Sequence, residues 1–345
     1  MKLDDLCEAF EALQFPGVEE QAHPERASVL GARSAVAAAI VDDEFLLDCM
    51  SWELLRLEDD RLGKGLIPFF TNPDLGIRCA FGYWPPGGTP GPHEHTAWTI
   101  TGVCRNQLEV LTYDRAESYR RRELIPKNNF PAPAGKVGFI YEPCIHAPRN
   151  PSGDWSLSLH VTSPRDGEPL ADHDEPLPGL AAFKSRFSPI EEVHAYTRVL
   201  VARHRHQYVH QLVRILGSMA VPGAERLLMQ CFGIASSATR RLIDQMMRGA
   251  LIKDAPAPPW LLTRTDKALV LSHRCKDGMV ALDAETENGL VEELVISNEA
   301  MEAIAFVARE SIFEVRALPG NLSREEQTAI AEMLEETGLF TRVPR

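Results

Sequence analysis

Hydrophobic residues recur at intervals of three and four along the first 65 residues, which is the period of an amphipathic helix. This pattern predicts helices at 4–13 and 27–47, separated by polar breaks that contain proline. From residue 66 onward, short runs rich in β-branched and aromatic residues alternate with Gly, Pro and Asn clusters. The strands predicted there lie at 77–84, 97–103, 108–113, 137–141 and 155–162. Their close spacing indicates an antiparallel β-barrel or sandwich.

The helical period returns after a polar, proline-bearing stretch at 166–179. Helices are expected at 199–216, 225–232 and 238–247, and a proline-rich linker at 254–260. Beyond the linker we expect a hairpin and two helices, the second opening with a capping box from Ser323 to Glu326. The chain is therefore expected to have four parts: N-terminal helices at 1–65, the barrel at 66–178, an α-helical segment at 179–253, and a small α+β winged-helix-like domain at 256–345.

Composition and charge narrow the classes of partner. The chain has 345 residues, 44% of them hydrophobic, and a net charge of −13. An acidic surface disfavours a nucleic-acid footprint, and no apolar run reaches the ~18 residues of a membrane-spanning helix. The first residues, Met1–Asp5, carry acids where a secretory signal would be apolar. We therefore expect a cytoplasmic protein with no nucleic-acid and no membrane partner, whose seven cysteines are reduced and mostly buried.

Three histidines carry the strongest chemical signal. His93 and His95 are two residues apart at the mouth of a predicted strand, so both imidazoles point to one face. His146 follows about fifty residues later, again beside a predicted strand. Three imidazoles on neighbouring strands would form a facial set with open positions, as redox-active iron requires, although Zn, Ni or Cu would also bind. The plainer alternative is a histidine pair exposed on the surface.

The two motifs resemble those of the cupin superfamily: Gly87-x5-His93-x-His95 and His146-x3-Asn150. This resemblance implies a mainly β, antiparallel, jelly-roll-like barrel with flanking helices. The glutamate ligand usual in cupins is absent, since Thr99 and Ile100 stand at its place. A three-histidine site without it is what the thiol dioxygenases of the cysteine dioxygenase group use. The run 84–98 is similar to bacterial members such as 3-mercaptopropionate dioxygenase, and the resemblance covers about residues 35–165.

The resemblance implies a function and a set of site residues. His93, His95 and His146 would hold Fe(II), with O2 as co-substrate, and a thiol would be oxidised to a sulfinate. Ser158 and His160 resemble the group's Ser-x-His-x-Tyr relay and would form a catalytic hydrogen-bonded pair outside the metal ligands. From the residues alone, a buried core histidine is an equal alternative for His160.

The chain also departs from that group. Thr162 replaces the relay tyrosine, and the stretch 65–69 lacks the arginine that clamps a substrate carboxylate. Arg61, Lys64 and Arg78 are nearby alternatives for this clamp; the candidate substrate-binding residues are Arg78, Trp98 and Thr162. The substrate is expected to be a small mercapto acid or a peptide-borne thiol. The alternative is a non-catalytic cupin sensor that binds a metal or ligand and whose C-terminal domain binds a protein partner.

A second group of polar residues precedes and enters the helical segment. Glu191 and His194 are three apart, and His206 and His210 four apart, so each pair shares a helix face. A di-iron bundle needs two Glu-x-x-His copies and further glutamates, whereas this chain has one copy, so we expect a solvated or interface face at 203–206. The order of barrel, helices and end domain resembles the Jumonji-type ribosomal oxygenases, which implies a homodimer formed through 179–253.

Overall fold

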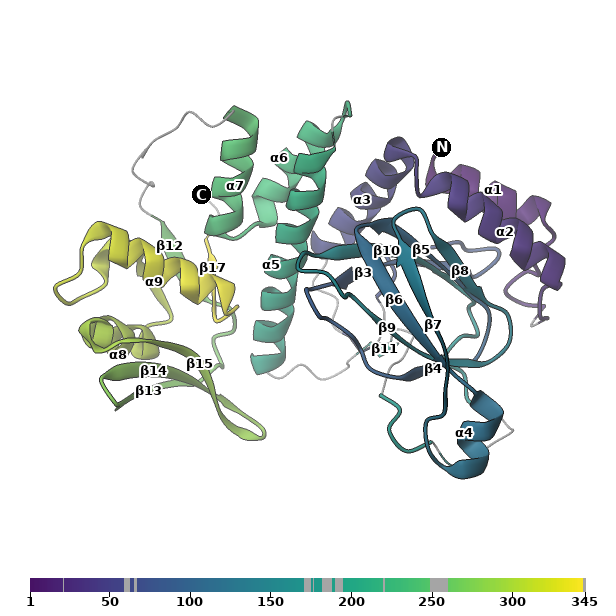
Figure 1. Ribbon diagram of the computed structural model, residues 1–345. Helices are drawn as coiled ribbons and strands as arrows, with labels where there is room; N and C mark the ends of the chain where they lie inside the picture. The colour runs from purple at the N-terminus through teal and green to yellow at the C-terminus, as the bar shows by residue number, and fades with distance from the viewer. Residues whose placement is uncertain are drawn as a thin grey trace. The chain divides into compact units, whose positions relative to one another are not determined.

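The computed structural model describes residues 1–20, 22–58, 63–64, 67–170, 175, 177–181, 188–189, 195–219, 221–248 and 260–343. The chain divides into two compact units, Met1–Pro189 and Ile190–Arg345 (Figure 1). The helices of the first unit are α1 (Leu3–Ala12), α2 (Arg26–Ala39), α3 (Asp43–Glu58) and α4 (Arg115–Arg121). Its strands are β1 (Gly63–Lys64), β2 (Phe70–Thr71), β3 (Arg78–Trp84), β4 (His93–His95), β5 (Thr99–Arg105), β6 (Gln107–Tyr113), β7 (Pro126–Pro133), β8 (Val137–Ile140), β9 (Cys144–Arg149), β10 (Ser156–Thr162) and β11 (Ser188–Pro189).

Two antiparallel sheets build most of the first unit. One has the strand order β2-β3-β10-β5-β8 and the other β4-β9-β6-β7. Residues of both sheets line one cavity, so the sheets enclose an interior between them. Strand β10 is central in its sheet and buried along nearly its whole length, although polar residues alternate with apolar ones along it. The predicted antiparallel β-rich fold with flanking helices is confirmed.

The N-terminal helices share a core with the sheets. Phe10 of α1 and the neighbouring Phe15 pack their rings against Trp98; Ile40, directly after α2, and Phe45 of α3 are fully buried. The helix predicted over 27–47 is in fact two helices. The Asp42 carboxylate accepts a hydrogen bond from the backbone of Glu44 and so starts α3 anew.

Three strands of the four-stranded sheet were not predicted from the sequence. Strand β7 contains three prolines and is exposed along most of its length, because it forms the edge of its sheet, where a missing N–H is tolerated. Strands β4 and β9 are short and polar, and they carry the three histidines. Polar strands of this kind lack the apolar alternation from which strands are predicted.

The second unit combines helices with two small antiparallel sheets, β16-β12-β17 and β13-β14-β15. Its elements are α5 (Ala195–Ser218), α6 (Ala224–Ile234), α7 (Ser237–Arg248), β12 (Leu261–Arg264), β13 (Leu271–Lys276), β14 (Met279–Thr286), β15 (Gly289–Ser297), α8 (Met301–Arg309), β16 (Ile312–Glu314), α9 (Arg324–Glu336) and β17 (Phe340–Arg342), with 3-10 turns at Asn298–Ala300 and Val315–Ala317. One apolar core joins α5, α8 and α9 to both sheets.

Two predictions for this unit are confirmed. The hairpin of β13 and β14 turns at Asp277 and Gly278, both with positive φ, as a tight two-residue turn requires. Helix α9 starts at the predicted capping box of Ser323 and Glu326. Residues 254–259 of the predicted linker lie outside the described residues. Among the helices that the structure describes, none combines the length and apolarity that crossing a membrane would take.

Candidate metal centre

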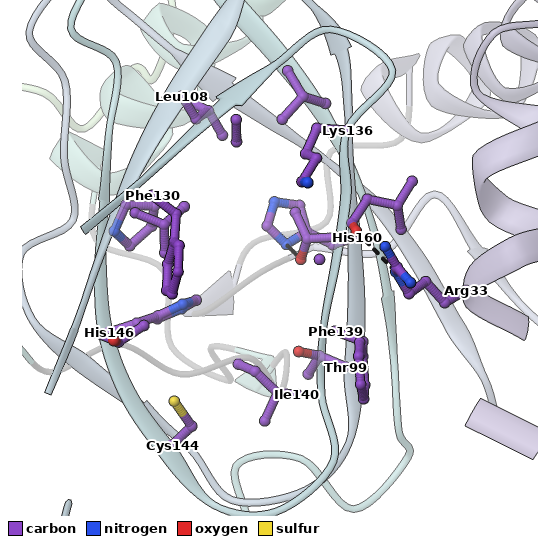
Figure 2. Close-up of a pocket in the computed structure, with 18 of the residues that line it drawn as sticks. Arg33, Thr99, Leu108, Phe130, Lys136, Phe139, Ile140, Cys144, His146 and His160 are labelled. Atoms are coloured by element: carbon purple, nitrogen blue, oxygen red, sulfur yellow. Dashed lines mark hydrogen bonds between the residues drawn. The ribbon is translucent and has the colours of Figure 1, made fainter. Parts of the chain in front are cut away.

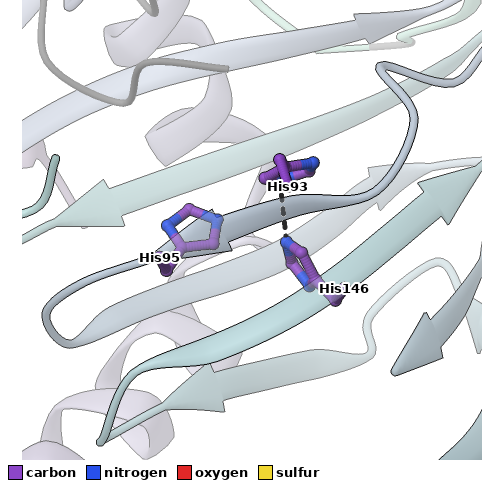
Figure 3. Close-up of side chains that lie close together, drawn as sticks. All are labelled: His93, His95 and His146. Carbon is purple, nitrogen blue, oxygen red and sulfur yellow. Dashed lines mark hydrogen bonds between the residues drawn. The ribbon is translucent and has the colours of Figure 1, made fainter. Parts of the chain in front are cut away.

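Antiparallel pairing of β4 with β9 brings the three predicted ligands together. His93 lies opposite His146 in the register, and His95 follows two residues later on the same face of β4. One nitrogen from each ring lies within 4.8 Å of the other two, and Figure 3 shows the rings of His93 and His146 facing each other. Within the described ranges, these residues form a group that could hold a metal ion.

The spacing of the ring nitrogens fits an ion held by imidazoles. The Nε2 atoms of His93 and His146 lie 2.9 Å apart. Two nitrogens each about 2.1 Å from one ion and at right angles to each other would be about 3 Å apart. The donor set therefore suits a divalent transition metal, and each of the three rings can offer one nitrogen.

Hydrogen bonds fix which ring nitrogen of His93 and His95 is available. The Nδ1–H of His93 donates to the carbonyl of Gly91 at 3.0 Å, and that of His95 donates to the carboxylate of Asp166 at 2.7 Å. Because each Nδ1 carries the proton, each Nε2 keeps its lone pair for a metal. Asp166 is fully buried, and its other oxygen accepts hydrogen bonds from the backbone of Thr96 and Ala97.

Sequence reasoning missed Asp166, which was assigned to a polar exit loop. No motif marks it, because it lies 71 residues from His95 and reaches the site only through the fold. Glu94 lies between two ligands yet is not part of the site. Strand alternation turns it to the opposite face, where the Tyr119 hydroxyl donates to its carboxylate at 2.7 Å.

Burial keeps His93, His146 and His160 neutral. It lowers the pKa of His93 to about 4 and that of His160 to about 3. The pKa of His146 also falls well below its ordinary value, first through burial and then through the neighbouring imidazoles. At neutral pH these rings are uncharged, which is the form that binds metals.

A cavity of about 610 Å³ lies between the two sheets and reaches His146 (Figure 2). Its walls are mainly apolar, with a few threonines, two cations and two imidazoles. The lining residues are Arg33, Trp84, Thr99, Thr101, Val103, Leu108, Val110, Thr112, Phe130, Pro131, Ala132, Lys136, Val137, Gly138, Phe139, Ile140, Cys144, His146, Pro148 and His160. This size and lining are typical of small-molecule sites.

Ser158 and His160 form the hydrogen-bonded pair that the sequence predicted. The Ser158 hydroxyl lies 2.9 Å from His160 Nε2 and accepts a hydrogen bond from Trp84 Nε1 at 2.7 Å. On the other side of the ring, Thr101 Oγ1 lies 3.3 Å from Nδ1. Gly82 lies against this hydrogen-bonded group: a Cβ added at this residue would lie 2.7 Å from both His160 Nε2 and Ser158 Oγ.

The three candidate substrate-binding residues are not among the residues that line the cavity. The guanidinium of Arg78 donates to the carbonyls of Ser163 and Asp166, so it holds the loop that bears the Asp166 carboxylate. Trp98 packs against phenylalanines of the N-terminal region, and Thr162 is buried in β10. Arg61 and the side chain of Lys64, the other clamp candidates, lie outside the described residues.

Asn150 of the second predicted motif joins neighbouring segments through hydrogen bonds. Its Nδ2 donates to the carbonyls of Trp84 at 2.9 Å and Asp154 at 2.7 Å. Its backbone pairs with Gly87 and Gly88, and Gly87 has φ +70°, a conformation that favours glycine. The glycine and the asparagine of the two motifs thus join the segment before β4 to the end of β9.

The second histidine group does not form a metal site within the part of the chain that the structure describes. His206 is buried and donates to the carbonyl of Glu335, so the expected solvated face is wrong at this residue. His210 lies 3.0 Å from the Thr239 hydroxyl. Glu191 and His194 lie outside the described residues.

The cysteines follow the expectation of reduced thiols. All seven are free, and four of them are buried: Cys49, Cys79, Cys104 and Cys231. Burial raises the pKa of the Cys104 thiol to about 12 and also raises that of Cys144, which lines the cavity. These thiols therefore stay protonated at neutral pH.

No protein-family model matches the chain, and no curated protein sequence matches it. Solved structures with partial similarity include cupins. A recombinant oxalate oxidase in complex with glycolate shares 24% identity over 26% of this chain and 43% of that one, with a TM-score of 0.22. An oxalate decarboxylase from Lactobacillus farciminis shares 21% identity over 26% of this chain and 24% of its own, also with a TM-score of 0.22. A cupin superfamily protein from Desulfitobacterium hafniense shares 14% identity over 25% and 66%, with a TM-score of 0.20. The chain thus spans less than half the length of the first two structures.

Proposed function

We propose that this chain is a non-haem Fe(II)-dependent oxygenase of the thiol dioxygenase type, which oxidises a thiol to a sulfinate with O2. The observation that carries the proposal is the convergence of three imidazoles beside a mainly apolar cavity. An ion held by imidazoles alone keeps its full positive charge, and that charge favours a thiolate over a neutral ligand.

The reaction balances without a further reductant. A thiol and one O2 give one sulfinic acid: the O–O bond breaks, two S–O bonds form, and the sulfur loses the four electrons that reduce the oxygen. Bound Fe(II) would supply the thiolate-binding position and the activation of O2. The thiol proton must be released as the thiolate forms, which requires a nearby acceptor.

The residues of the chain are suited to bind the substrate and move this proton. His160 lines the cavity, and its two nitrogens are bonded to Ser158 and Thr101, whose hydroxyls can each donate or accept. Trp84 can only donate, so it orients the serine oxygen. In the proposed reaction the His160 ring stays neutral and passes a proton from one ring nitrogen to the other along this hydrogen-bonded group, while the apolar walls exclude water.

The test is metal content and oxygen uptake of the full-length chain. We expect near-stoichiometric iron in the wild type and its loss in His146→Ala. His273→Ala replaces an exposed histidine of the second unit and should leave the iron unchanged. Iron-loaded protein should consume one O2 per thiol oxidised with at least one member of a panel of amino-acid, mercapto-acid and peptide thiols. Retained iron in His146→Ala, or no thiol-dependent uptake across the panel, would refute the proposal.

A second candidate function is a non-catalytic cupin sensor. It is favoured by the absence from the cavity lining of the three residues expected to bind substrate, Arg78, Trp98 and Thr162. A sensor would bind the metal or a ligand without any thiol-dependent oxygen uptake. The same panel of thiols therefore separates the two functions.

The remaining proposals concern the rest of the chain. We propose that residues 256–345 form a winged-helix-like domain that recognises a protein rather than a nucleic acid, because they carry nine Lys and Arg against sixteen Asp and Glu. The helical segment at 179–253 is proposed to form a homodimer, and the protein to act in the cytoplasm without a membrane partner. Light scattering of the full-length chain tests the dimer.

A further inference from the structure

The cavity is positively charged in a chain that is strongly acidic. The charged residues in its lining, apart from the neutral histidines, are Arg33 and Lys136, and no carboxylate is among the residues that line it. The whole chain carries a net charge of −13. Cations concentrated in one cavity of an acidic protein therefore call for an anion as their partner.

Backbone contacts place these two cations next to each other. Arg33 projects from α2, and its Nε donates to the carbonyl of Val137 at 3.0 Å, the residue that follows Lys136. Lys136 ends the turn between β7 and β8, and its carbonyl accepts a hydrogen bond from Val103 N at 2.9 Å. Gly135 supports the turn with φ +83°. The backbone at Lys136 and Val137, which carries one cation and binds the other, is thus hydrogen-bonded to the sheet.

Both side chains keep nitrogen donors that are available to a ligand. Among the residues that the structure describes, the Lys136 ammonium makes no hydrogen bond or ion pair, and it is exposed. Arg33 uses Nε for the Val137 carbonyl and lies 5.9 Å from the Phe139 ring, which leaves the two terminal nitrogens of its fork. A guanidinium fork and an ammonium that line the same cavity suit a carboxylate, which accepts several charge-assisted hydrogen bonds.

The rest of the cavity suits an apolar body. In Figure 2, Arg33 and Lys136 lie on one side of the cavity and His146 on the other, with His160 between them. Phe130, Phe139 and several aliphatic residues form walls in the space from one side to the other. A carboxylate bound by the cations would direct its chain across this apolar space toward the histidines.

We propose that the cavity binds an amphiphilic organic carboxylate, with the carboxylate between Arg33 and Lys136 and the apolar body reaching toward His146 and His160. This inference rests on the proposed function, since it describes the substrate class of the same site. The substrate is then longer and more apolar than a short mercapto acid. Its anion is recognised by the helix α2 and the β7–β8 turn rather than by the segment before the barrel.

Isothermal titration with decanoate, decanol and decyltrimethylammonium tests the proposal on the full-length chain, both as purified and after chelation of metal. We expect decanoate to bind about tenfold more tightly than decanol, and the cation not at all. Lys136→Met should weaken decanoate binding about fivefold, and adding Arg33→Met should weaken it further. Lys267→Met, at an exposed lysine of the second unit that is not among the residues lining the cavity, is the matched control and should leave binding unchanged.

The outcomes separate this inference from the proposed function. Decanol binding as tightly as decanoate, or decanoate binding that ignores both substitutions, would overturn the inference while leaving thiol oxidation intact. Charge-dependent decanoate binding in a protein that holds no iron and consumes no oxygen would refute the function and support the inference. If Arg33→Met does not fold, the titration of Lys136→Met and its salt dependence still test the inference, because a charge-driven complex weakens as ionic strength rises.

Discussion

The buried carboxylate of Asp166 gives the sharpest test of how this site is held. Its oxygens accept hydrogen bonds from His95 Nδ1 at 2.7 Å and from the backbone of Thr96 at 2.9 Å. Asp166→Asn keeps the shape but removes the charge, and its single acceptor oxygen cannot serve both donors equally. Hydrogen bonds to charged groups contribute about 1.5–3 kcal/mol, so we expect the free energy of unfolding to fall by about that amount.

The larger effect of Asp166→Asn should be on the metal. Loss of a carboxylate that orients a ligating histidine costs about 10- to 100-fold in metal affinity, because the ring loses its fixed tautomer and direction. Titration with Co(II) against a chromophoric chelator measures this affinity without oxygen chemistry. The matched control is Asp283→Asn, another buried carboxylate, which pairs with Arg274 in the second unit.

Asp283→Asn should lower stability and leave Co(II) affinity unchanged. The reasoning would be refuted if folded Asp166→Asn bound Co(II) as tightly as the wild type. A double-mutant cycle with His95→Ala sharpens the result, since Asp166→Asn should have no further effect on metal binding once the ring is gone.

Two further predictions concern packing and pH. Gly82→Ala places a Cβ 2.7 Å from both His160 Nε2 and Ser158 Oγ, so we expect a loss of about 1–3 kcal/mol in unfolding free energy, measured in urea. Gly153→Ala, whose Cβ meets nothing within 4 Å, is the control, and equal midpoints for the two variants would contradict the prediction. Burial raises the pKa of Glu335 above its ordinary value of 4.5, so the fold favours the protonated form and loses stability as pH rises through the raised value. Glu335→Gln should abolish this part of the loss as the pH rises above 4.5, and an unchanged pH profile would argue against it.

The β-rich fold was predictable because the sequences of its central strands are typical of β-strands. Strand β10 alternates polar and apolar residues, and β3 and β5 on either side of it are rich in aromatic and β-branched residues. Edge and site strands were not predictable in the same way. The edge strand β7 pairs with β6, and its proline-rich sequence does not indicate this pairing. The sequence pattern predicted α2 and α3 as one helix, because the break between them depends on a single residue, Asp42, whose carboxylate caps the start of α3.

The site was predictable only as far as local geometry fixes it. Two histidines two residues apart on a strand must share a face, and the third follows from pairing of the two motif strands. The contacts of Asp166, Arg33 and Lys136 depend on loops and a helix that approach from distant parts of the sequence. Arg78 shows the converse: a cation near the motifs in sequence is engaged with backbone carbonyls of the loop that supports the site.

His146 is the residue through which the cavity and the three-histidine group become one site. It lines the cavity, whereas His93 and His95 do not, so a bound molecule meets the group on the His146 side. Cys144 lines the same wall, opposite His95 in the register, and would compete for an ion if it were a thiolate. Burial raises the pKa of this thiol, so it stays protonated at neutral pH and is a poor ligand. In the proposed reaction the open side of a bound ion would thus be left to a thiol from outside, and oxygen uptake with and without added thiol would register that difference.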